Sequence, residues 1–536
     1  MSISVQYLDI PVGANEDATA QGFSQPFGNA AQIIPGVPDT PWATLEPDGW
    51  ALDGSAQLFP NEPMAIGWWS ETRTGEDGRF AVPPVLSILF SEAFSATGLT
   101  FTFWPSMHHW CSEIAVRWYN GENLLAETVA NPDGPDWILS YTVEGFDRIE
   151  ITLLATNVPG QFAKLQRLQV GQVIVFLQDE LTKVNLLNEA DPSLCEMTVD
   201  TLTVEVRDKR GRNLIPQKNQ QMILYRNGEQ IATQYVTESQ RESRQGYRFQ
   251  CQSTIGLLEG TYLGGFVEIK SVGELLADVL GDMPFVLDPA FDRTELSGYL
   301  PVCTRREALQ QIAFAVGAVV TTQGDGVIRL SPVADSVSGS FGVGDIFTGA
   351  KLTQKPRLAG IHLTAHSYVP DETVSTLLNG ETVSGLRKLY IFSEPHHSYE
   401  ITGGTLDSFG DNWVKITADG PVTLTGKKYL HSQFVYTWEN PGITAAEKGN
   451  VLTVENATLV NPGNVETVLE RLRKYAAYRN TLTQTVVVQG QKAGALVESP
   501  NPWGSVTEGF ITSMESEFTR NGHTASVTIQ GREVQK

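Results

Sequence analysis

The sequence predicts a mainly β protein of several domains: an N-terminal β-sandwich, two further β-rich regions and a small α/β insert. At 536 residues the chain is too long for one ordinary domain, and typical domain sizes suggest roughly three to five. Charged residues make up only 18% of the chain, whereas Gly, Pro, Thr and Val are plentiful, which favours strands and turns over helices. Short β-branched and aromatic runs, separated by turn residues, recur along most of the sequence.

Residues 1–42 contain five prolines, several glycines and little periodicity. We therefore expect an extended arm that is ordered only where it lies against another part of the protein. The first twenty residues show neither a basic region nor an apolar stretch of the kind found in signal peptides, and no apolar run approaches the ~20 residues that cross a bilayer. We expect no membrane-spanning segment.

A β-sandwich, or jelly roll, is predicted for residues 43–172. Its expected strands are LSILF, GLTFTFW, EIAVRWY, WILSYTV and DRIEITLL. Asn120 and Gly121, which stand between AVRWY and ENLLAETV, give the strongest short signal for a β-hairpin. Strands at this regular spacing are typical of sandwiches.

Residues 173–270 form a second β region, in which Asn227 and Gly228 predict another tight hairpin. The pattern then changes. Ser271 with Glu274, and Thr304 with Glu307, have the spacing of capping boxes at the starts of two helices. Because the hairpin sequence AVVTTQGDGVIRL follows, we predict a compact α/β insert over residues 271–334.

Strands return over residues 335–536, among them GIHLTAHSY, RKLYIFS, NWVKITA and QFVYTWEN. One longer helix is predicted at 465–479, because Val465, Val468, Leu469 and Leu472 fall on a single stripe at helical spacing. We interpret the whole segment as a second β-barrel region that contains one amphipathic helix.

The stretch WPSMHHWCSE, residues 104–113, gathers residue types that often form metal or catalytic sites. Counted back along the expected strand from Trp118, Trp110 lies on the same face as Trp118, whereas His109 lies on the other. We therefore expect a core-facing tryptophan row and a partly polar outer row. The remaining candidates for contact with a glycan or a subunit are Trp104, His109, Trp110 and Trp118.

Nothing else in the sequence indicates catalysis or a cofactor. His362 and His366 alternate with apolar residues, and on a strand such positions lie roughly 13 Å apart, too far to share a metal ion. Phosphate-binding loops and a GxSxG nucleophile motif are absent, and the four cysteines form no CxxC pair. We expect no catalytic residue, no metal, no cofactor and no enzymatic activity, with free thiols in a reducing cytoplasm.

The formal net charge is −23, from 38 Lys and Arg against 61 Asp and Glu, and neither basic type occurs before Arg73. This acidity argues against tight binding to nucleic acid or to an anionic membrane. It fits a conduit through which DNA passes, because a basic wall would bind phosphate. Acidity that simply keeps a large protein soluble is an equally open interpretation.

The order of segments from Val184 to Pro332 resembles the tail hub, or tail-tip, proteins of bacteriophages and related contractile injection systems. The resemblance rests on NLLNEADPSLCEMTVDTLTVEVRD, on MILYRNGEQIATQYV, and on PVCTRREALQQIAFAVGAVVTTQGDGVIRL, with LERLRKYAAYRNTLTQTVVVQG near the end of the second barrel. The segment from LEPDGWALDGS to residue 171 is similar to galactose-binding-like, discoidin-type jelly rolls.

This resemblance implies two tail-tube-like β-barrel domains and a homotrimeric ring in the virion tail, assembled in the bacterial host cytoplasm. The ring would join the tail tube or a distal tail ring to the tape-measure end and to spike or receptor-binding proteins. DNA would pass through its channel without specific binding, and the jelly roll would contact a host surface glycan or a neighbouring baseplate protein. The alternatives are a glycan-binding adhesin and a β-rich glycoside hydrolase.

Overall fold

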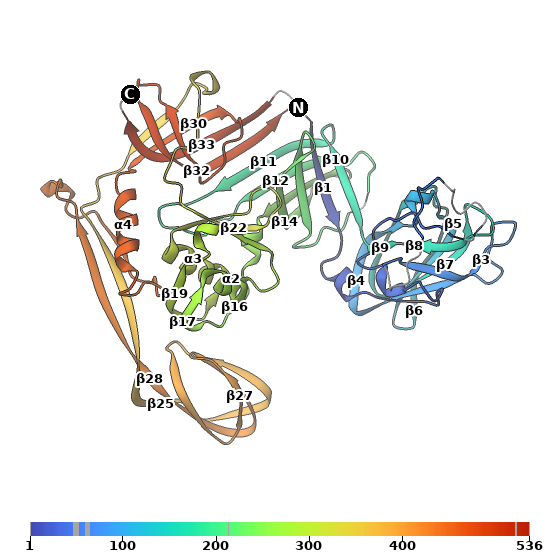
Figure 1. The fold of residues 1–536 in the computed structure, drawn as a ribbon, viewed down its shortest axis with the longest axis horizontal. Helices are drawn as coiled ribbons and strands as arrows, with labels where there is room; N and C mark the ends of the chain where they lie inside the picture. The colour runs from blue at the N-terminus through green and yellow to red at the C-terminus, as the bar shows by residue number, and fades with distance from the viewer. Residues whose placement is uncertain are drawn as a thin grey trace.

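The computed structural model shows a mainly β protein, which confirms the predicted fold class. It describes residues 2–44, 46, 53–58, 65–212, 214–519 and 522–534. Figure 1 shows a sandwich at one end of the long axis, a large sheet, a small α/β insert beneath it, and a long β ribbon that leaves the body near the C-terminal helix. Within these described ranges, no helix is both long and apolar enough to cross a membrane.

The N-terminal sandwich has a larger sheet with the strand order β2-β4-β7-β5-β6, in which β9 also pairs with β4. A second sheet pairs β3 with β8. Their bounds are β2 Thr19–Gln21, β3 Trp68–Arg73, β4 Val85–Thr102, β5 Cys111–Asn120, β6 Asn123–Ala130, β7 Asp136–Thr156, β8 Phe162–Leu165 and β9 Arg167–Val170. Buried aromatic and branched side chains such as Trp68, Phe101 and Phe146 fill the space between the sheets.

Both predicted Asn-Gly hairpins are confirmed. β5 turns into β6 through Gly121, at φ 56°, and β13 (Gln221–Arg226) turns into β14 (Glu229–Arg241) through Asn227 and Gly228, at φ 51° and 83°. Positive φ is the backbone conformation that tight hairpin turns require, and Gly and Asn adopt it at low cost.

Residues 1–42 are not the extended arm that we predicted. β1 (Ile3–Asp9) lies inside the large sheet, between β13 and β10 (Gln172–Leu177), with Val5 and Tyr7 fully buried. After the short helix α1 (Ala14–Asp17), the chain joins the sandwich, where Ile33 is also fully buried. All five prolines lie after β1, whereas ISVQYLD itself has the alternating burial of a strand with one buried face.

The large sheet has thirteen strands in the order β10-β1-β13-β14-β15-β12-β11-β32-β33-β30-β24, with β31 and β23 branching from β32. The remaining bounds are β11 Leu181–Glu189, β12 Thr201–Arg207, β15 Gly246–Gln252, β23 Gly339–Ser340, β24 Lys351–Gln354, β30 Asn480–Val487, β31 Leu496–Pro500, β32 Val506–Thr519 and β33 Gly522–Val534. Two separate apolar cores lie along it, one under the strands of each half. Antiparallel pairing of β11 with β32, from Asn185↔Glu517 to Glu189↔Ser513, joins the halves.

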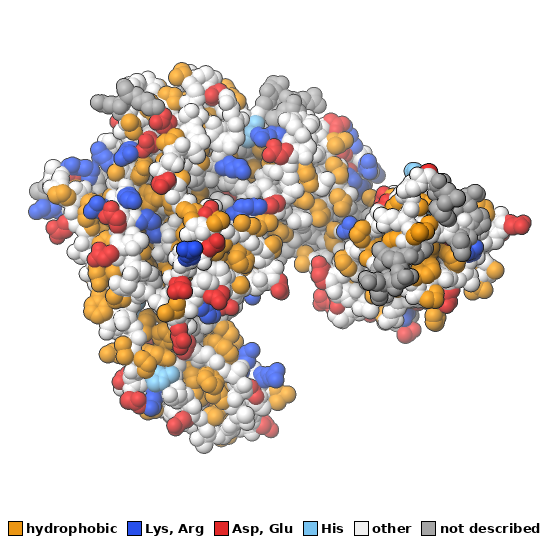
Figure 2. Space-filling model, in the orientation of Figure 1, with side chains coloured by type: hydrophobic (Ala, Val, Ile, Leu, Met, Phe, Trp, Pro, Cys, Tyr) orange, Lys and Arg blue, Asp and Glu red, His pale blue; other side chains and the backbone are white. Residues whose placement is uncertain are grey.

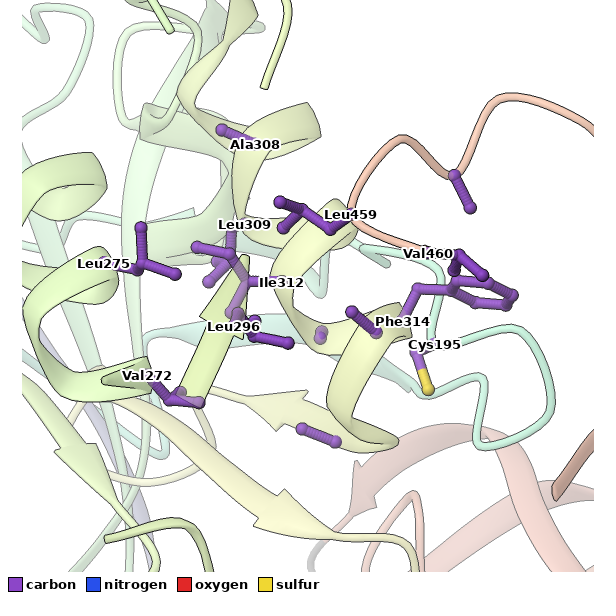
Figure 3. Close-up of a cluster of buried hydrophobic side chains, with 14 of the residues drawn as sticks. Cys195, Val272, Leu275, Leu296, Ala308, Leu309, Ile312, Phe314, Leu459 and Val460 are labelled. Atoms are coloured by element: carbon purple, nitrogen blue, oxygen red, sulfur yellow. The ribbon is translucent and has the colours of Figure 1, made fainter. Parts of the chain in front are cut away.

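The insert contains two helices, α2 (Val272–Leu280) and α3 (Arg305–Val316), and both capping boxes are confirmed. It starts with β16 at Thr261 rather than at the predicted residue 271, because β16 and β17 pair with β20 and β19. Its strands are β16 Thr261–Tyr262, β17 Gly265–Ser271, β18 Phe285–Leu287, β19 Glu295–Leu300, β20 Cys303–Thr304, β21 Ala318–Thr321 and β22 Ile328–Pro332. Figure 3 shows Leu275 of α2 facing Leu309 and Ile312 of α3, with Leu459 and Val460 from a distant segment closing the cluster. The insert therefore shares its core with the C-terminal part of the chain.

The segment 335–536 is not one continuous barrel region. Residues 360–454 leave the sheet and form a β ribbon of β25 (Gly360–Ile391) and β28 (Trp413–Glu439), to which β26 (His396–Thr402), β27 (Thr405–Phe409) and β29 (Val451–Val454) are added. The far end of the ribbon has its own small apolar core. Helix α4 (Val465–Tyr475) packs against the ribbon base and ends four residues before the predicted end.

We predict that Thr304→Ala will lower the free energy of unfolding by about 1 kcal/mol, because the Thr304 hydroxyl accepts a hydrogen bond from the N–H of Glu307 and caps α3. Denaturant unfolding followed by circular dichroism measures this change. Thr304→Ser keeps the hydroxyl and should remain within a few tenths of a kcal/mol of the parent protein. If Thr304→Ala and Thr304→Ser lowered the free energy of unfolding equally, the lost cap hydrogen bond would not be the cause.

Candidate functional site

The stretch WPSMHHWCSE forms a loop that closes on itself and then enters β5. Pro105–Met107 make one 3-10 turn, His108 ends it at φ 49°, and Trp104 and His109 exchange two backbone hydrogen bonds of 3.0 and 3.1 Å. Pairing of β5 with β7 shifts register twice between Cys111 and Ile114. These bulges break the strict alternation of side chains between the two faces of the strand, which the prediction for residues 108–118 assumed.

The predicted faces are therefore wrong on the loop side of the bulges. Cys111 and His109, expected on an outer row, are buried, whereas Trp110, expected in the core, is half-buried. Beyond the bulges the alternation holds, since Val116 and Trp118 are both buried as expected.

The four candidate contact residues do not form one cluster. Trp104 and His109 lie edge to face, with ring centroids 6.4 Å apart, and are each 2% exposed. Trp118 is 1% exposed and stacks on Tyr141 at 5.2 Å. The indole N–H of Trp110 donates to the Pro132 carbonyl at 3.1 Å. Of the four, only Trp110 has exposed surface that a glycan or a subunit could contact.

A buried ion pair that no sequence pattern indicated lies beside this loop. The Lys164 Nζ donates to Glu46 Oε1 at 2.8 Å, and both side chains are 1% exposed. The same ammonium lies 4.7 Å from the Trp69 ring and 4.9 Å from the Trp104 ring. The partners are separated by 118 residues, so no local spacing could reveal them.

Burial dominates the electrostatics of this cluster. It lowers the pKa of Lys164 to about 8 despite the opposing effect of Glu46, and it raises the pKa of Cys111 to about 12. It also holds the pKa of His109 well below its usual range, and among the described residues neither ring nitrogen of His109 has a hydrogen-bond partner. These groups are sealed from solvent, so the cluster belongs to the interior of the sandwich.

A second candidate is a hollow of about 730 Å³ where the ribbon bends past the insert. Phe266 of β17 lies 4.3 Å from the ring of Tyr429 and 5.4 Å from that of Tyr368, the latter two on β28 and β25. The Phe266 N–H donates to Asp411 Oδ2 at 2.7 Å, which ties the far end of the ribbon to the insert.

Two histidines continue this aromatic cluster into the ribbon. His366 Nε2 lies 2.8 Å from the Glu455 carbonyl, and His366 Nδ1 lies 3.0 Å from His431 Nε2. Because a carbonyl only accepts, His366 must donate through Nε2 and accept at Nδ1 from the His431 N–H. A second proton on His366 would sit on Nδ1, so the contact would then require His431 Nε2 to give up its proton and accept. Burial lowers the pKa of His366, which favours the neutral ring.

The third kind of candidate is a set of strand edges with which no other strand in the described part of the chain pairs. β10 and β24 are the two ends of the large sheet. Residues 429–439 of β28 pair with β25 on one side only, since β26 and β27 pair with earlier residues of β28. Leu430, Phe434 and Val435 on this edge are 60, 49 and 60% exposed. Exposed apolar edges are templates for pairing with another chain, so they indicate assembly surfaces.

No group of three or more His, Cys, Asp or Glu side chains that could hold a metal ion occurs in the described ranges. His362 and His366 lie on one strand as expected, and His366 is engaged with His431 and with the backbone. Cys111, Cys195, Cys251 and Cys303 are free thiols.

No protein-family model matches the sequence, and no curated protein matches it either. Solved structures match parts of this chain at TM-scores below 0.5. The 43 kDa tail protein of prophage MuSo2 from Shewanella oneidensis has a TM-score of 0.41 and 12% identity, over 66% of this chain and 95% of that one. A tail protein from Neisseria meningitidis MC58 has a TM-score of 0.39 and 11% identity, over 66% and 93%. A family 32 carbohydrate-binding module of NanJ from C. perfringens, solved with galactose, has a TM-score of 0.20 and 17% identity, over 31% and 98%.

We predict that Lys164→Met will lower the free energy of unfolding by about 3–5 kcal/mol, because it leaves the buried Glu46 carboxylate without its partner. Urea unfolding followed by tryptophan fluorescence measures the sandwich transition. The double variant Lys164→Met with Glu46→Leu should recover most of the loss. Lys183→Met, at an exposed position, is the matched control and should change little. If Lys164→Met alone were as stable as the parent protein, this prediction would be contradicted.

We also predict that acid weakens the ribbon contact. Because the folded-state pKa of His366 is lowered, the unfolded chain binds the proton more tightly, and stability is lost as the pH falls below the unfolded value of about 6.5. Thermal unfolding at pH 7.5 and 5.5 should show a smaller acid loss for His366→Gln than for the parent. His362→Gln is the control on the same strand. Equal losses in all three proteins would contradict the role of His366.

Proposed function

We propose that this protein is a structural hub of a phage tail tip or baseplate, in which three copies form a ring in the virion tail. The observation that carries the proposal is the large sheet, in which two strand groups with separate cores are joined by β11 and β32 and end in two open edges. The segment order that resembles tail hub proteins supports the same proposal.

Open edges at the two ends of one sheet suit head-to-tail association. Such a contact uses two different surfaces of each copy and closes into a ring when the rotation between copies allows it. Val175 and Leu177 on β10 are 42 and 57% exposed, which leaves apolar surface for a neighbour on that edge. Two joined strand groups per copy would give a trimer six similar units around its axis, which fits a sixfold tail tube.

The ribbon and the sandwich extend away from the sheet and would contact other tail proteins. In this proposal the ribbon edge at residues 429–439 pairs with a tape-measure, spike or distal-ring component, and DNA crosses the central channel without specific binding. Acidic side chains that line a channel weaken phosphate contact only over about 8 Å at physiological salt. The chain is assembled in the bacterial host cytoplasm and acts as a structural protein without enzymatic activity.

A second candidate function is a glycan-binding adhesin, which one observation favours. The sandwich surface has a hollow of about 700 Å³ lined by Phe23, Val82 and Pro83 together with Gln21 and Glu71. Phe23 is 83% exposed, and an exposed ring beside carboxylate and amide groups suits a sugar face and its hydroxyls. In the hub, the same hollow would let the sandwich contact a host surface glycan. An adhesin would bind glycan as a monomer, whereas a hub must form a ring.

We predict that the purified protein reaches the mass of a trimer as its concentration rises, and that negative-stain images show a ring with a central hole. Light scattering coupled to size-exclusion chromatography measures the mass. A protein that remains monomeric at every concentration and shows no rings on a tail-tube template would contradict the hub.

We further predict no retardation of double-stranded DNA by the protein at physiological salt, because the net charge is −23 and phosphate contacts provide most non-specific affinity. An electrophoretic mobility assay measures this. Salt-sensitive retardation at micromolar protein would contradict a channel through which DNA passes freely.

A further inference from the structure

The sandwich is inserted between two paired strands of the large sheet. The chain leaves the sheet after β1, which ends at Asp9, and returns as β10, which begins at Gln172, and these two residues are register partners. Figure 2 shows the sandwich, at the right, set apart from the main body and connected to it on one side. The two chain crossings and the side chains around them therefore determine how the sandwich sits on the sheet.

A buried polar network lies at these crossings. Its five side chains come from the sheet, from strand β4 of the sandwich and from the loop before β13, and each is at most 5% exposed: Tyr7, Asp9, Thr97, Gln172 and Gln220. Thr97 Oγ1 donates to Asp9 Oδ2 and accepts from Gln172 Nε2 at 2.9 Å. Thr97 therefore connects the sandwich to both strands from which it is inserted.

The carboxamide of Gln220 is oriented by the backbone around it. Its Oε1 accepts from the Gln217 N–H at 2.7 Å, and its Nε2 donates to the Ile10 carbonyl at 3.1 Å. Since a backbone N–H only donates and a carbonyl only accepts, the two ends of the amide cannot be exchanged. Gln220 therefore offers an oxygen to the Tyr7 hydroxyl, and its nitrogen donates to Asp9 Oδ1 at 3.2 Å.

The Tyr7 hydroxyl meets two acceptors but carries one proton. It lies 3.2 Å from Asp9 Oδ1 and is also hydrogen-bonded to Gln220 Oε1. If Asp9 is ionised, one of these two oxygen–oxygen contacts has no proton in it. A proton on Asp9 Oδ1 removes the conflict, because Asp9 then donates to Tyr7 and Tyr7 donates to Gln220.

The charges around Asp9 leave its carboxyl without a direct counter-ion. Within the described residues Asp9 belongs to no ion pair, and the guanidinium of Arg212, which acts on it from a distance, is held 2.8 Å from Asp208. The sandwich reaches the network through the hydroxyls of Thr97 and Ser140, which carry no charge. Burial raises the pKa of Asp9, although its hydrogen bonds and Arg212 oppose this shift.

The phenol of Tyr7 keeps its own proton. Burial and the neighbouring Asp9 raise the pKa of Tyr7 well above its usual range. Tyr247 and Cys251 of β15 are the titratable groups that face Tyr7 from the sheet, and burial also raises the pKa of the Cys251 thiol. Asp9 is therefore the group in this network that changes charge first as the pH varies.

We propose that a proton on Asp9 holds the sandwich against the large sheet, and that this joint loosens when the proton is lost. The protonated carboxyl completes an unbroken series of donors and acceptors from Thr97 in the sandwich to Gln220 in the sheet loop. Ionisation leaves a buried charge and an unsatisfied contact where both chain crossings meet, and entry of water into the joint relieves both. The inference concerns a single copy of the chain and does not depend on the proposed ring.

The sign of the pH effect follows from burial. Because the folded-state pKa of Asp9 is raised, the folded joint binds the proton more tightly than an exposed aspartate does. Its stability is therefore lost as the pH rises from the unfolded value of about 4 through the folded pKa. The ribbon contact at His366 responds in the opposite direction, so a readout specific to the joint is required.

The first test identifies the proton. Infrared spectroscopy distinguishes a protonated carboxyl from a carboxylate, and the difference between the parent and Asp9→Asn isolates the signal of Asp9. The protonated signal should persist above the pH at which exposed aspartates ionise. Tyr7→Phe should lower the midpoint by roughly one pH unit, because the ionised acid then has no conflict with the hydroxyl. If Tyr7→Phe raised the midpoint, the tyrosine would be a donor to the carboxylate and the proposal would be overturned.

The second test measures the joint itself. The Gly171 N–H donates to the Gly98 carbonyl of the sandwich at 2.9 Å, so its hydrogen exchange reports on contact between the sandwich and the sheet. Relative to the intrinsic rate at each pH, exchange around Gly171 should rise about tenfold or more once Asp9 ionises. Asp9→Asn should remove this pH dependence. Asp133→Asn, at an exposed position of the sandwich, is the matched control and should keep it.

Two further outcomes would overturn the proposal. One is a midpoint for Asp9 at or below the ordinary aspartate value of about 4. The other is protection of Gly171 that is the same at every pH, or that keeps the parent's pH dependence in Asp9→Asn. If Asp9→Asn does not fold, the difference between the infrared titrations of the parent and Tyr7→Phe decides the question, because it contains only groups near Tyr7.

Discussion

Pairing between β11 and β32 is the interaction on which the rest of the structure depends. It joins residues 185–189 to residues 513–517 in one antiparallel ladder and makes two strand groups into a single sheet. The insert and the ribbon lie between these strands in sequence. The insert connects the first strand group to the second, whereas the ribbon leaves the second group after β24 and returns to it before β30. Without this ladder, the two cores would lie under separate sheets.

The insert is the part that sequence patterns predict best. Ser271 and Thr304 cap their helices as the glutamate three positions after each indicates, because a capping box depends on residues that are close in sequence. The Asn-Gly turns are predicted for the same reason, since the turn conformation selects those residue types. Local rules of this kind do not require any knowledge of distant partners.

The predictions failed where the structure depends on a contact with residues far along the chain or on a local β-bulge. β1 is a central strand because residues 172–177 and 221–226 flank it, which no local pattern reveals. Bulges in β5 reversed the expected sides of His109 and Trp110. The Lys164 and Glu46 pair and the ribbon both arise from contacts between residues far apart in sequence, so only the folded chain shows them.

The strand order also constrains the time at which the protein can complete its fold. The sandwich can form while the chain is still being synthesised, and β1 can then pair with β10. The second partner of β1 is complete only at residue 226, and the ladder of β11 with β32 only at residue 517. The β24 edge is placed only when β30 and β33 have formed, near the end of the chain. A ribosome that stalls early would release a product without this edge. The presence of the β24 edge therefore shows that residues 480–531 have been synthesised and have folded.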